Sequence, residues 1–315
     1  MVTHVVIPCF AVRRHILNVI SAVGTEVAAI HVVDDACPQS TGNFVEEKCN
    51  DPRVQVHRHE INQGVGGAVV TGIRAALAQG ATIIIKIDGD GQMDPALIPK
   101  FIKPLQRGRA DYTKGNRFYQ LEYLRDMPLI RLLGNTTLSI LTKLSSGYWG
   151  LMDPTNGYFA IHAKVAAALP LDKIARGYFF ESDLLFRLAV LRAVVEDIPM
   201  PAIYRDERSH LSVIKVTGQF AVLHTIRLFK RIFYNYFLRD FNAASLMLLV
   251  ALPLLGFGLV FGITKWHEGV VANSTVSSGT VMLSALPIIL GLQLLLSAIQ
   301  YDIYQQPRVP IHDKL

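Results

Sequence analysis

Ile83-Ile84-Ile85-Lys86-Ile87-Asp88-Gly89-Asp90-Gly91-Gln92-Met93-Asp94-Pro95 is the stretch that decides the fold of this 315-residue chain. Its β-branched run predicts a buried strand over 83–87. The strand stops at two aspartates one residue apart, and each is followed by a glycine. Two carboxylates at this spacing either form a polar turn or share a divalent cation, because hard oxygen ligands suit Mg²⁺ or Mn²⁺.

The segments before this stretch alternate between expected strands and helices. Apolar runs at 2–8, 27–33 and 54–57 predict three further strands, and 11–24 and 64–78 predict helices. This order is typical of parallel strand-helix-strand units, in which ligands bind beyond the carboxyl ends of the strands. Six residues should therefore meet at one rim: Pro8, Asp34, Asp35, Gln63, Gly64 and Asp88.

A dinucleotide-binding fold is disfavoured by the glycine pattern. Its Gly-X-Gly-X-X-Gly fingerprint does not follow the first strand, and 64–69 reads Gly-Val-Gly-Gly-Ala-Val, without the third glycine. The glycines here more plausibly let the backbone approach a ligand or a neighbouring strand closely.

The composition of the chain indicates membrane-spanning segments. Hydrophobic residues make up 51% of the chain and charged residues 18%. Residues 244–263 and 280–299 contain no Asp, Glu, Lys or Arg and are long enough to cross a bilayer. A buried hairpin of two soluble helices is the alternative. The N-terminus lacks the basic flank of a signal peptide, and three cysteines without metal-ligand spacing fit a reducing compartment.

The segment before the first span predicts an amphipathic helix. Apolar residues recur at helical spacing over 219–238, while Arg227, Lys230 and Arg231 fall away from that stripe. Such a helix either lies in the membrane interface, attracted by anionic lipid, or packs on the core. Cations cluster before the first span, whereas the loop 264–279 has only Lys265, which predicts that the part before the spans and both termini lie in the cytoplasm. The net charge of +6 is thus explained by the membrane, with no nucleic-acid partner.

Four motifs carry a resemblance to a known family. They are Ile7-Pro8, Val33-Asp34-Asp35, Asn62-Gln63-Gly64-Val65-Gly66-Gly67-Ala68 and the stretch Asp88 to Pro95. In their order and spacing, residues 1–215 resemble the inverting GT-A glycosyltransferases of family 2. The nearest group is the polyprenyl-phosphate glycosyltransferases, which include dolichyl-phosphate mannose synthase and bacterial undecaprenyl-phosphate sugar transferases. One departure is Val65, where many relatives carry a lysine.

The resemblance implies a fold and four parts of the chain. The fold is α/β, GT-A, with a Rossmann-like, mostly parallel mixed sheet, an interfacial amphipathic helix and two C-terminal transmembrane helices. The parts are a cytoplasmic GT-A catalytic domain (1–212), a juxtamembrane amphipathic region (213–243), a two-helix transmembrane hairpin (244–299) and a cytoplasmic tail (300–315).

The resemblance also implies site residues. Asp34 and Asp35 would bind the donor nucleoside, and Asp88, Asp90 and Gln92 would hold Mg²⁺ or Mn²⁺, directly or through water. Other donor contacts would come from Pro8, Gln63, Gly64, Arg205 and Lys215. Arg117 and Arg131 would bind the acceptor phosphate, although Arg131 fits a solvated helix charge as well. Either Glu181 or Asp183 would act as base or orient the acceptor; as an acidic pair opening a helix, they could instead only favour the helix dipole.

Together, these expectations describe a metal-dependent, inverting hexosyltransferase. It would move a sugar from a nucleotide-sugar, with UDP as the expected nucleotide, to a polyprenyl phosphate such as undecaprenyl phosphate. It would be an integral protein of the inner or cell membrane, active in cell-envelope polysaccharide assembly, and a homo-oligomer. One alternative uses a saccharide hydroxyl as acceptor, in O-antigen or exopolysaccharide assembly. Another is a non-catalytic, membrane-anchored nucleotide-sugar-binding protein.

Overall fold

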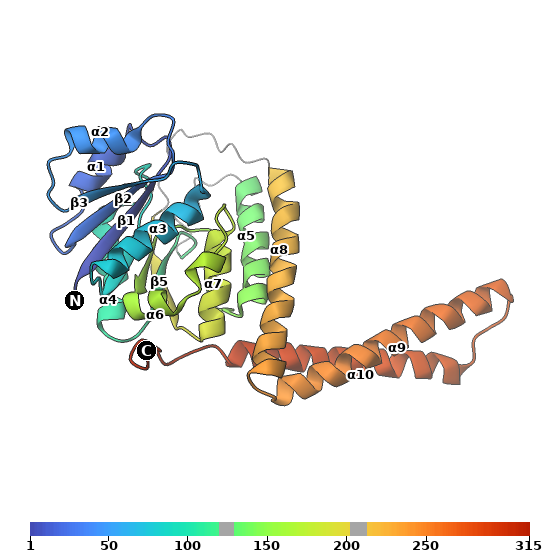
Figure 1. Cartoon of the computed structure of the whole chain (residues 1–315). Helices are drawn as coiled ribbons and strands as arrows, with labels where there is room; N and C mark the ends of the chain where they lie inside the picture. The colour runs from blue at the N-terminus through green and yellow to red at the C-terminus, as the bar shows by residue number, and fades with distance from the viewer. Residues whose placement is uncertain (120–128, 202–212) are drawn as a thin grey trace. The chain divides into compact units, whose positions relative to one another are not determined.

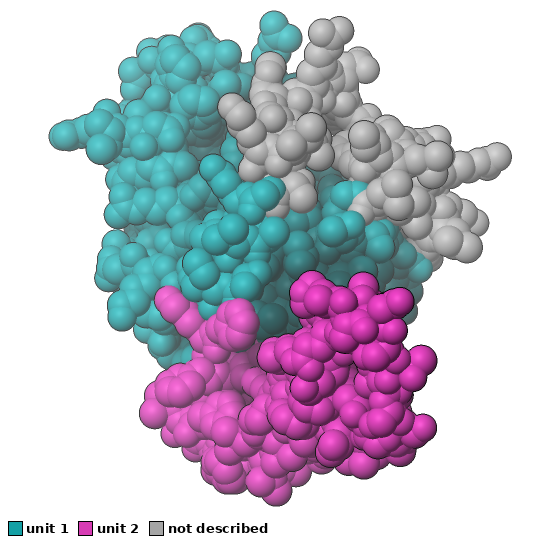
Figure 2. Space-filling view, turned by 90° about the vertical axis from the view of Figure 1, so that its right-hand side faces the viewer, with its two compact units in different colours: residues 1–228, 307–315 teal, residues 229–306 magenta. Residues whose placement is uncertain are grey.

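A computed structural model of the chain describes residues 1–119, 129–201 and 213–315 (Figure 1). It divides into two compact units, one formed by residues 1–228 and 307–315 and the other by residues 229–306, coloured separately in Figure 2. The first unit contains a mixed α/β sheet, and the second is helical.

The first unit is built on a seven-stranded sheet in the order β3-β2-β1-β4-β6-β5-β7. Four neighbouring strands, β3, β2, β1 and β4, run parallel, and β6 runs antiparallel to both of its neighbours. The strands are β1 (Thr3–Cys9), β2 (Ala29–Asp34), β3 (Val54–Arg58), β4 (Ile83–Lys86), β5 (Tyr112–Asn116), β6 (Phe159–His162) and β7 (Val195–Pro199). The expected mostly parallel mixed sheet is confirmed.

Helices cover both faces of this sheet (Figure 1). Alternate strand residues face opposite layers: Ile83 and Ile85 pack with α1 and α4, and Ile84 packs with α3, α6 and α7. The helices of this unit are α1 (Ile16–Ser21), α2 (Thr41–Lys48), α3 (Gly64–Ala78), α4 (Ile98–Gln106), α5 (Leu129–Ser146), α6 (Ala163–Ala168) and α7 (Phe180–Leu191), with single 3₁₀ turns at Pro95–Leu97 and Leu171–Lys173.

The expected elements are present, with shifted ends. Helix α3 has the expected bounds, whereas α1 is shorter than the predicted 11–24. It starts late because the chain turns first, with Ala11 at a φ of 59° in the left-handed region.

The second unit contains the helices α9 (Ala243–Val271) and α10 (Ser278–Tyr304), which pack along each other. Gly258 permits this approach, since a Cβ there would lie 2.7 Å from a side-chain carbon of Ile288. Both helices are long and apolar enough to cross a membrane. Each contains one predicted span and extends beyond it at both ends.

The amphipathic segment forms α8 (Val213–Phe233) and a π-helical turn, η4 (Tyr234–Leu238). Its apolar side chains Val222, Ile226, Phe229 and Phe233 are exposed. The expectation that Arg227 and Arg231 attract anionic lipid is wrong for this structure. Arg227 pairs with the buried Asp183, and the buried Arg231 pairs with Asp302, because a charge removed from water needs a partner.

The end of the chain returns to the first unit. The backbone N–H groups of Ile311 and His312 donate to the buried carboxylate of Asp111, each at 3.0 Å. Nδ1 of His312 lies 2.6 Å from the same carboxylate. The chain therefore leaves the first unit after Leu228 and rejoins it at Pro307.

Candidate active site

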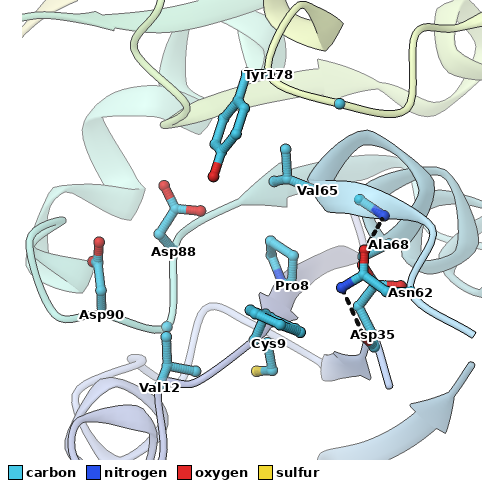
Figure 3. Close-up of a pocket in the computed structure, with 14 residues that line it drawn as sticks. Pro8, Cys9, Val12, Asp35, Asn62, Val65, Ala68, Asp88, Asp90 and Tyr178 are labelled. Carbon is cyan, nitrogen blue, oxygen red and sulfur yellow. Dashed lines mark hydrogen bonds between the residues drawn. The ribbon is translucent and has the colours of Figure 1, made fainter. Parts of the chain in front are cut away.

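A cavity of about 470 Å³ opens at the carboxyl ends of β1 and β4 (Figure 3). The strand register explains its position, because it pairs Cys9 with Asp34 and Val6 with Lys86, so the three strand ends reach one rim. The cavity is lined by Pro8, Cys9, Phe10, Val12, Asp35, Asn62, Gly64, Val65, Ala68, Asp88, Gly89, Asp90, Gly177 and Tyr178. In Figure 3, Asp88 and Asp90 lie at one end of the cavity and Asp35 at the other.

The two aspartates after β2 have different roles in this structure. Asp34 is buried, and its two carboxylate oxygens accept from the backbone N–H groups of Cys37 and Gly42, at 2.8 and 2.6 Å. These bonds hold the loop that enters α2. Asp35 is buried as well, but it lines the cavity. Its Oδ1 accepts from the backbone N–H of Gln63 at 2.8 Å and lies 2.7 Å from Nδ1 of His59. Of the two expected nucleoside contacts, the structure brings Asp35 to the cavity.

The glycine-rich start of α3 forms another part of the wall. Gly64 has a φ of 80°, a conformation that favours glycine. The N–H of Gly66 donates to the carbonyl of Arg176 at 2.7 Å, which ties α3 to the loop before α7. That loop places Gly177 and the exposed ring of Tyr178 over the cavity. Tyr178 belongs to the segment 178–183 whose residues the sequence predicts to shape the sugar pocket, but it is not among the individually predicted site residues.

The expected metal ligands lie on the loop after β4. Asp88 and Asp90 both line the cavity, and Asp90 Oδ1 accepts from the backbone N–H of Gln92 at 2.9 Å. Gln92 does not line this cavity. The two carboxylates are hard oxygen donors of the kind that Mg²⁺ and Mn²⁺ prefer, so they fit such an ion. Within residues 1–119, 129–201 and 213–315, no group of three His, Cys, Asp or Glu side chains could hold a metal. An ion here would take further ligands from a bound diphosphate or water.

Lys86, the last residue of β4, had not been expected as a site residue. Its side chain is 1% exposed, and its Nζ lies 2.7 Å from Asp88 Oδ1. The sequence does indicate a special role for Lys86, because it lies in a strand that is predicted to be buried. A lysine is almost never fully buried unless it has a charged partner. Lys86 also lies near Glu181. Burial raises the pKa of Glu181 to about 8, with Lys86 opposing the rise and Asp88 adding to it.

Glu181 and Asp183 are separated by the structure. Asp183 is fully buried and accepts from Arg187 Nε at 2.9 Å, Arg227 Nε at 2.5 Å and the backbone N–H of Ala175 at 3.0 Å. Its carboxylate therefore binds α8 and the loop before α7 to the start of α7. Glu181 is half-buried and lies near the Lys86–Asp88 pair, although it does not line the cavity itself.

Among the cations predicted to contact the donor or the acceptor phosphate, Arg117 is the one whose side chain is described. Arg117 makes a two-pronged contact with the buried Asp153, through Nε and an Nη nitrogen at 2.7 Å each. Burial favours a raised pKa for Asp153, but the hydrogen bonds and charge of Arg117 outweigh it and hold this pKa below its usual value. Arg205 and the side chains of Arg131 and Lys215 lie outside the described residues.

Comparisons with known proteins agree on one family. A family model described as glycosyl transferase family 2 matches residues 4–169. The chain is 30% identical over 177 residues to an undecaprenyl-phosphate mannosyltransferase from Micrococcus luteus, covering 56% of this chain and 72% of that protein. It is 28% identical over 217 residues to a UDP-N-acetylglucosamine–dolichyl-phosphate N-acetylglucosaminyltransferase from Methanococcus voltae, covering 64% and 86%.

Solved structures with a similar fold include glucosyl-3-phosphoglycerate synthase from Mycobacterium tuberculosis in complex with phosphoglyceric acid. It has a TM-score of 0.55 and 18% identity, over 73% of this chain and 79% of that one. The same synthase in complex with Mn²⁺, uridine diphosphate and glucosyl-3-phosphoglycerate has a TM-score of 0.53, with the same identity and coverage. At this identity, the likeness supports the fold.

Proposed function

The chain belongs to glycosyl transferase family 2, and from this premise we propose that it transfers a sugar from a nucleotide-sugar donor to a polyprenyl phosphate at a membrane surface. It is a glycosyltransferase with the GT-A fold expected from its motifs. The observation that carries the proposal is that one and the same cavity has Asp35 at one end and the Asp88–Asp90 pair at the other. This spacing of polar groups suits a nucleoside at one end and its diphosphate at the other.

The acceptor is proposed from two further features. The names of the two relatives described above include undecaprenyl phosphate in one case and dolichyl phosphate in the other. The apolar helices α9 and α10 and the exposed apolar side chains of α8 would keep the enzyme at the surface where such a lipid resides. Holding the catalytic part near the lipid headgroup raises the effective concentration of the acceptor phosphate. By the distribution of cations, this surface is the cytoplasmic one.

The reaction follows from the roles of these residues. An oxygen of the acceptor phosphate attacks the anomeric carbon, and the bond from this carbon to the diphosphate breaks with inversion. Asp88 and Asp90, with Gln92, would hold a divalent cation, which neutralises negative charge on the leaving nucleoside diphosphate. Asp35 orients the nucleoside. An acceptor phosphate monoester is largely ionised near neutral pH, so Glu181 need only orient it.

A second candidate uses a saccharide hydroxyl as the acceptor. It is favoured by the position of Glu181, whose carboxylate lies near Asp88 at the edge of the site and whose pKa is raised to about 8 by burial. A hydroxyl must lose its proton during attack, and a carboxylate whose pKa lies near the working pH is an effective base.

The two candidates are distinguished by the acceptor that becomes labelled. Purified full-length protein in detergent would be incubated with Mn²⁺ or Mg²⁺, radiolabelled UDP- and GDP-sugars and undecaprenyl phosphate. We expect labelled lipid with one of the donors. If no donor labels the lipid, while a saccharide acceptor becomes labelled, the first proposal fails and the second replaces it.

The Glu181→Gln variant separates the same two mechanisms. An orienting residue should cost about tenfold or less in the transfer rate to lipid phosphate, whereas a general base should cost about 10²- to 10⁴-fold. We expect the smaller loss, measured as initial rates at saturating donor. Asp183→Asn is the matched variant: it weakens a buried ion-pair network, and we expect it to lower the unfolding temperature more than Glu181→Gln does. Equal unfolding temperatures would contradict the assignment of Asp183.

A further inference from the structure

The buried lysine at the end of β4 has no role in the mechanism above. Lys86 is one of the largest fully buried side chains among the described residues, and its Nζ contacts Asp88 Oδ1 at 2.7 Å. The ammonium also lies over the ring of Phe180, whose centre is 5.8 Å from Nζ. One oxygen of Asp88 is therefore paired with Lys86, while the Asp88 side chain remains 29% exposed on the cavity wall.

The space for this ammonium is provided by Gly157, which precedes β6. A Cβ on residue 157 would lie 2.3 Å from Lys86 Nζ, 3.2 Å from Asp88 Oδ2 and 3.4 Å from Glu181 Oε1. The first distance excludes a Cβ unless Lys86 moves. The polar ends of Lys86, Asp88 and Glu181 therefore meet around residue 157, and this residue must be glycine for the Lys86 ammonium to keep its position.

We propose that Lys86 is a positioning residue that orients Asp88 and cancels one of the two negative charges of the Asp88–Asp90 pair. The consequence concerns the order of binding. With one charge cancelled, the Asp88–Asp90 pair binds a divalent cation only weakly when no donor is present. The diphosphate of a bound donor supplies further negative charge and so raises the affinity for the cation. The cation and the donor then bind together. The inference rests on the proposed metal role of Asp88 and Asp90.

The decisive measurement is manganese binding without nucleotide, sugar or lipid. Mn²⁺ would be titrated into detergent-purified full-length protein and its free concentration followed by electron paramagnetic resonance. Because Lys86→Met removes a cation from contact with a metal ligand, we expect its dissociation constant for Mn²⁺ to fall about three- to tenfold. Addition of UDP should narrow this difference. The transfer rate should nevertheless fall, since Asp88 loses the contact that orients it.

Gly157→Ala provides an independent test that leaves the lysine in the chain. Its added methyl group displaces Nζ, so the variant should also bind Mn²⁺ more tightly and transfer more slowly. Lys86→Ala makes room for that methyl group, so adding Gly157→Ala to Lys86→Ala should change Mn²⁺ binding little. If Lys86→Met does not fold, the Gly157→Ala variants still test whether the Lys86 ammonium weakens Mn²⁺ binding.

Lys114→Met is the matched control. Lys114 is also 1% exposed and pairs with an aspartate, since its Nζ lies 3.1 Å from Asp197 Oδ1. Its loss should lower the unfolding temperature without tightening Mn²⁺ binding. The proposal is overturned if folded Lys86→Met and Gly157→Ala bind Mn²⁺ no more tightly than the wild type does, or show no detectable binding. It is also overturned if Lys114→Met binds Mn²⁺ as tightly as Lys86→Met does. Because the assay contains no lipid, a wrong acceptor would not affect this result.

Discussion

Replacing Asp90 by asparagine is expected to lower the rate of sugar transfer by about 10²- to 10³-fold and to leave the protein folded. The variant removes one of the two carboxylates that would hold a cation against the leaving diphosphate, and this charge stabilisation is needed most in the transition state. The amide oxygen of asparagine can still accept from the N–H of Gln92, which Asp90 Oδ1 does at 2.9 Å. The loop should therefore keep its shape.

Transfer would be measured as label incorporated into undecaprenyl phosphate, and folding by the thermal unfolding temperature. Asp94→Asn is the control on the same loop. Asp94 caps the 3₁₀ turn at Pro95–Leu97 by accepting from the N–H of Ala96 and does not line the cavity with Asp88 and Asp90. Its loss should change the rate by less than about threefold, because asparagine is an equally good cap. Full activity of folded Asp90→Asn would refute the metal assignment.

Arg117→Ala is expected to lower the free energy of unfolding by about 3–5 kcal/mol, because it strands the fully buried carboxylate of Asp153 without its counter-charge. The acceptor-phosphate role that the resemblance implies for Arg117 would instead make weaker acceptor binding the main effect. The two-pronged contact in the structure makes loss of stability the larger one. Chemical denaturation monitored by circular dichroism would measure it.

A double variant separates stability from acceptor binding. Arg117→Ala with Asp153→Asn removes both charges and should recover much of the lost stability. If the recovered protein still needs a much higher concentration of undecaprenyl phosphate, then Arg117 also binds the acceptor. If its KM for the lipid returns to the wild-type value, the predicted acceptor role of Arg117 is wrong. A double variant no more stable than Arg117→Ala would contradict the ion-pair explanation.

Much of the fold was predictable because its signals are local. The isoleucine run 83–85, the strand endings near Pro8 and at Asp34 and the glycine start of α3 each depend on a few neighbouring residues. Strand direction then brings their ends to one rim. The antiparallel placement of β6 between β4 and β5 was not predictable in this way, because it depends on pairing between segments about 75 residues apart, from Ile84 to Ile161.

The sequence by itself determined the class of enzyme, the two apolar helices and the position of the Asp88–Asp90 pair at the end of a buried strand. Only the tertiary structure decided which of two neighbouring or nearly neighbouring carboxylates lies at or next to the cavity. It brought Asp35 rather than Asp34 to the cavity wall, placed Glu181 rather than Asp183 near Asp88, and paired the ammonium of Lys86 with Asp88. The physical reason is that a charged side chain takes its role from the partners that burial brings to it. These partners, such as Arg227 for Asp183, come from distant parts of the chain.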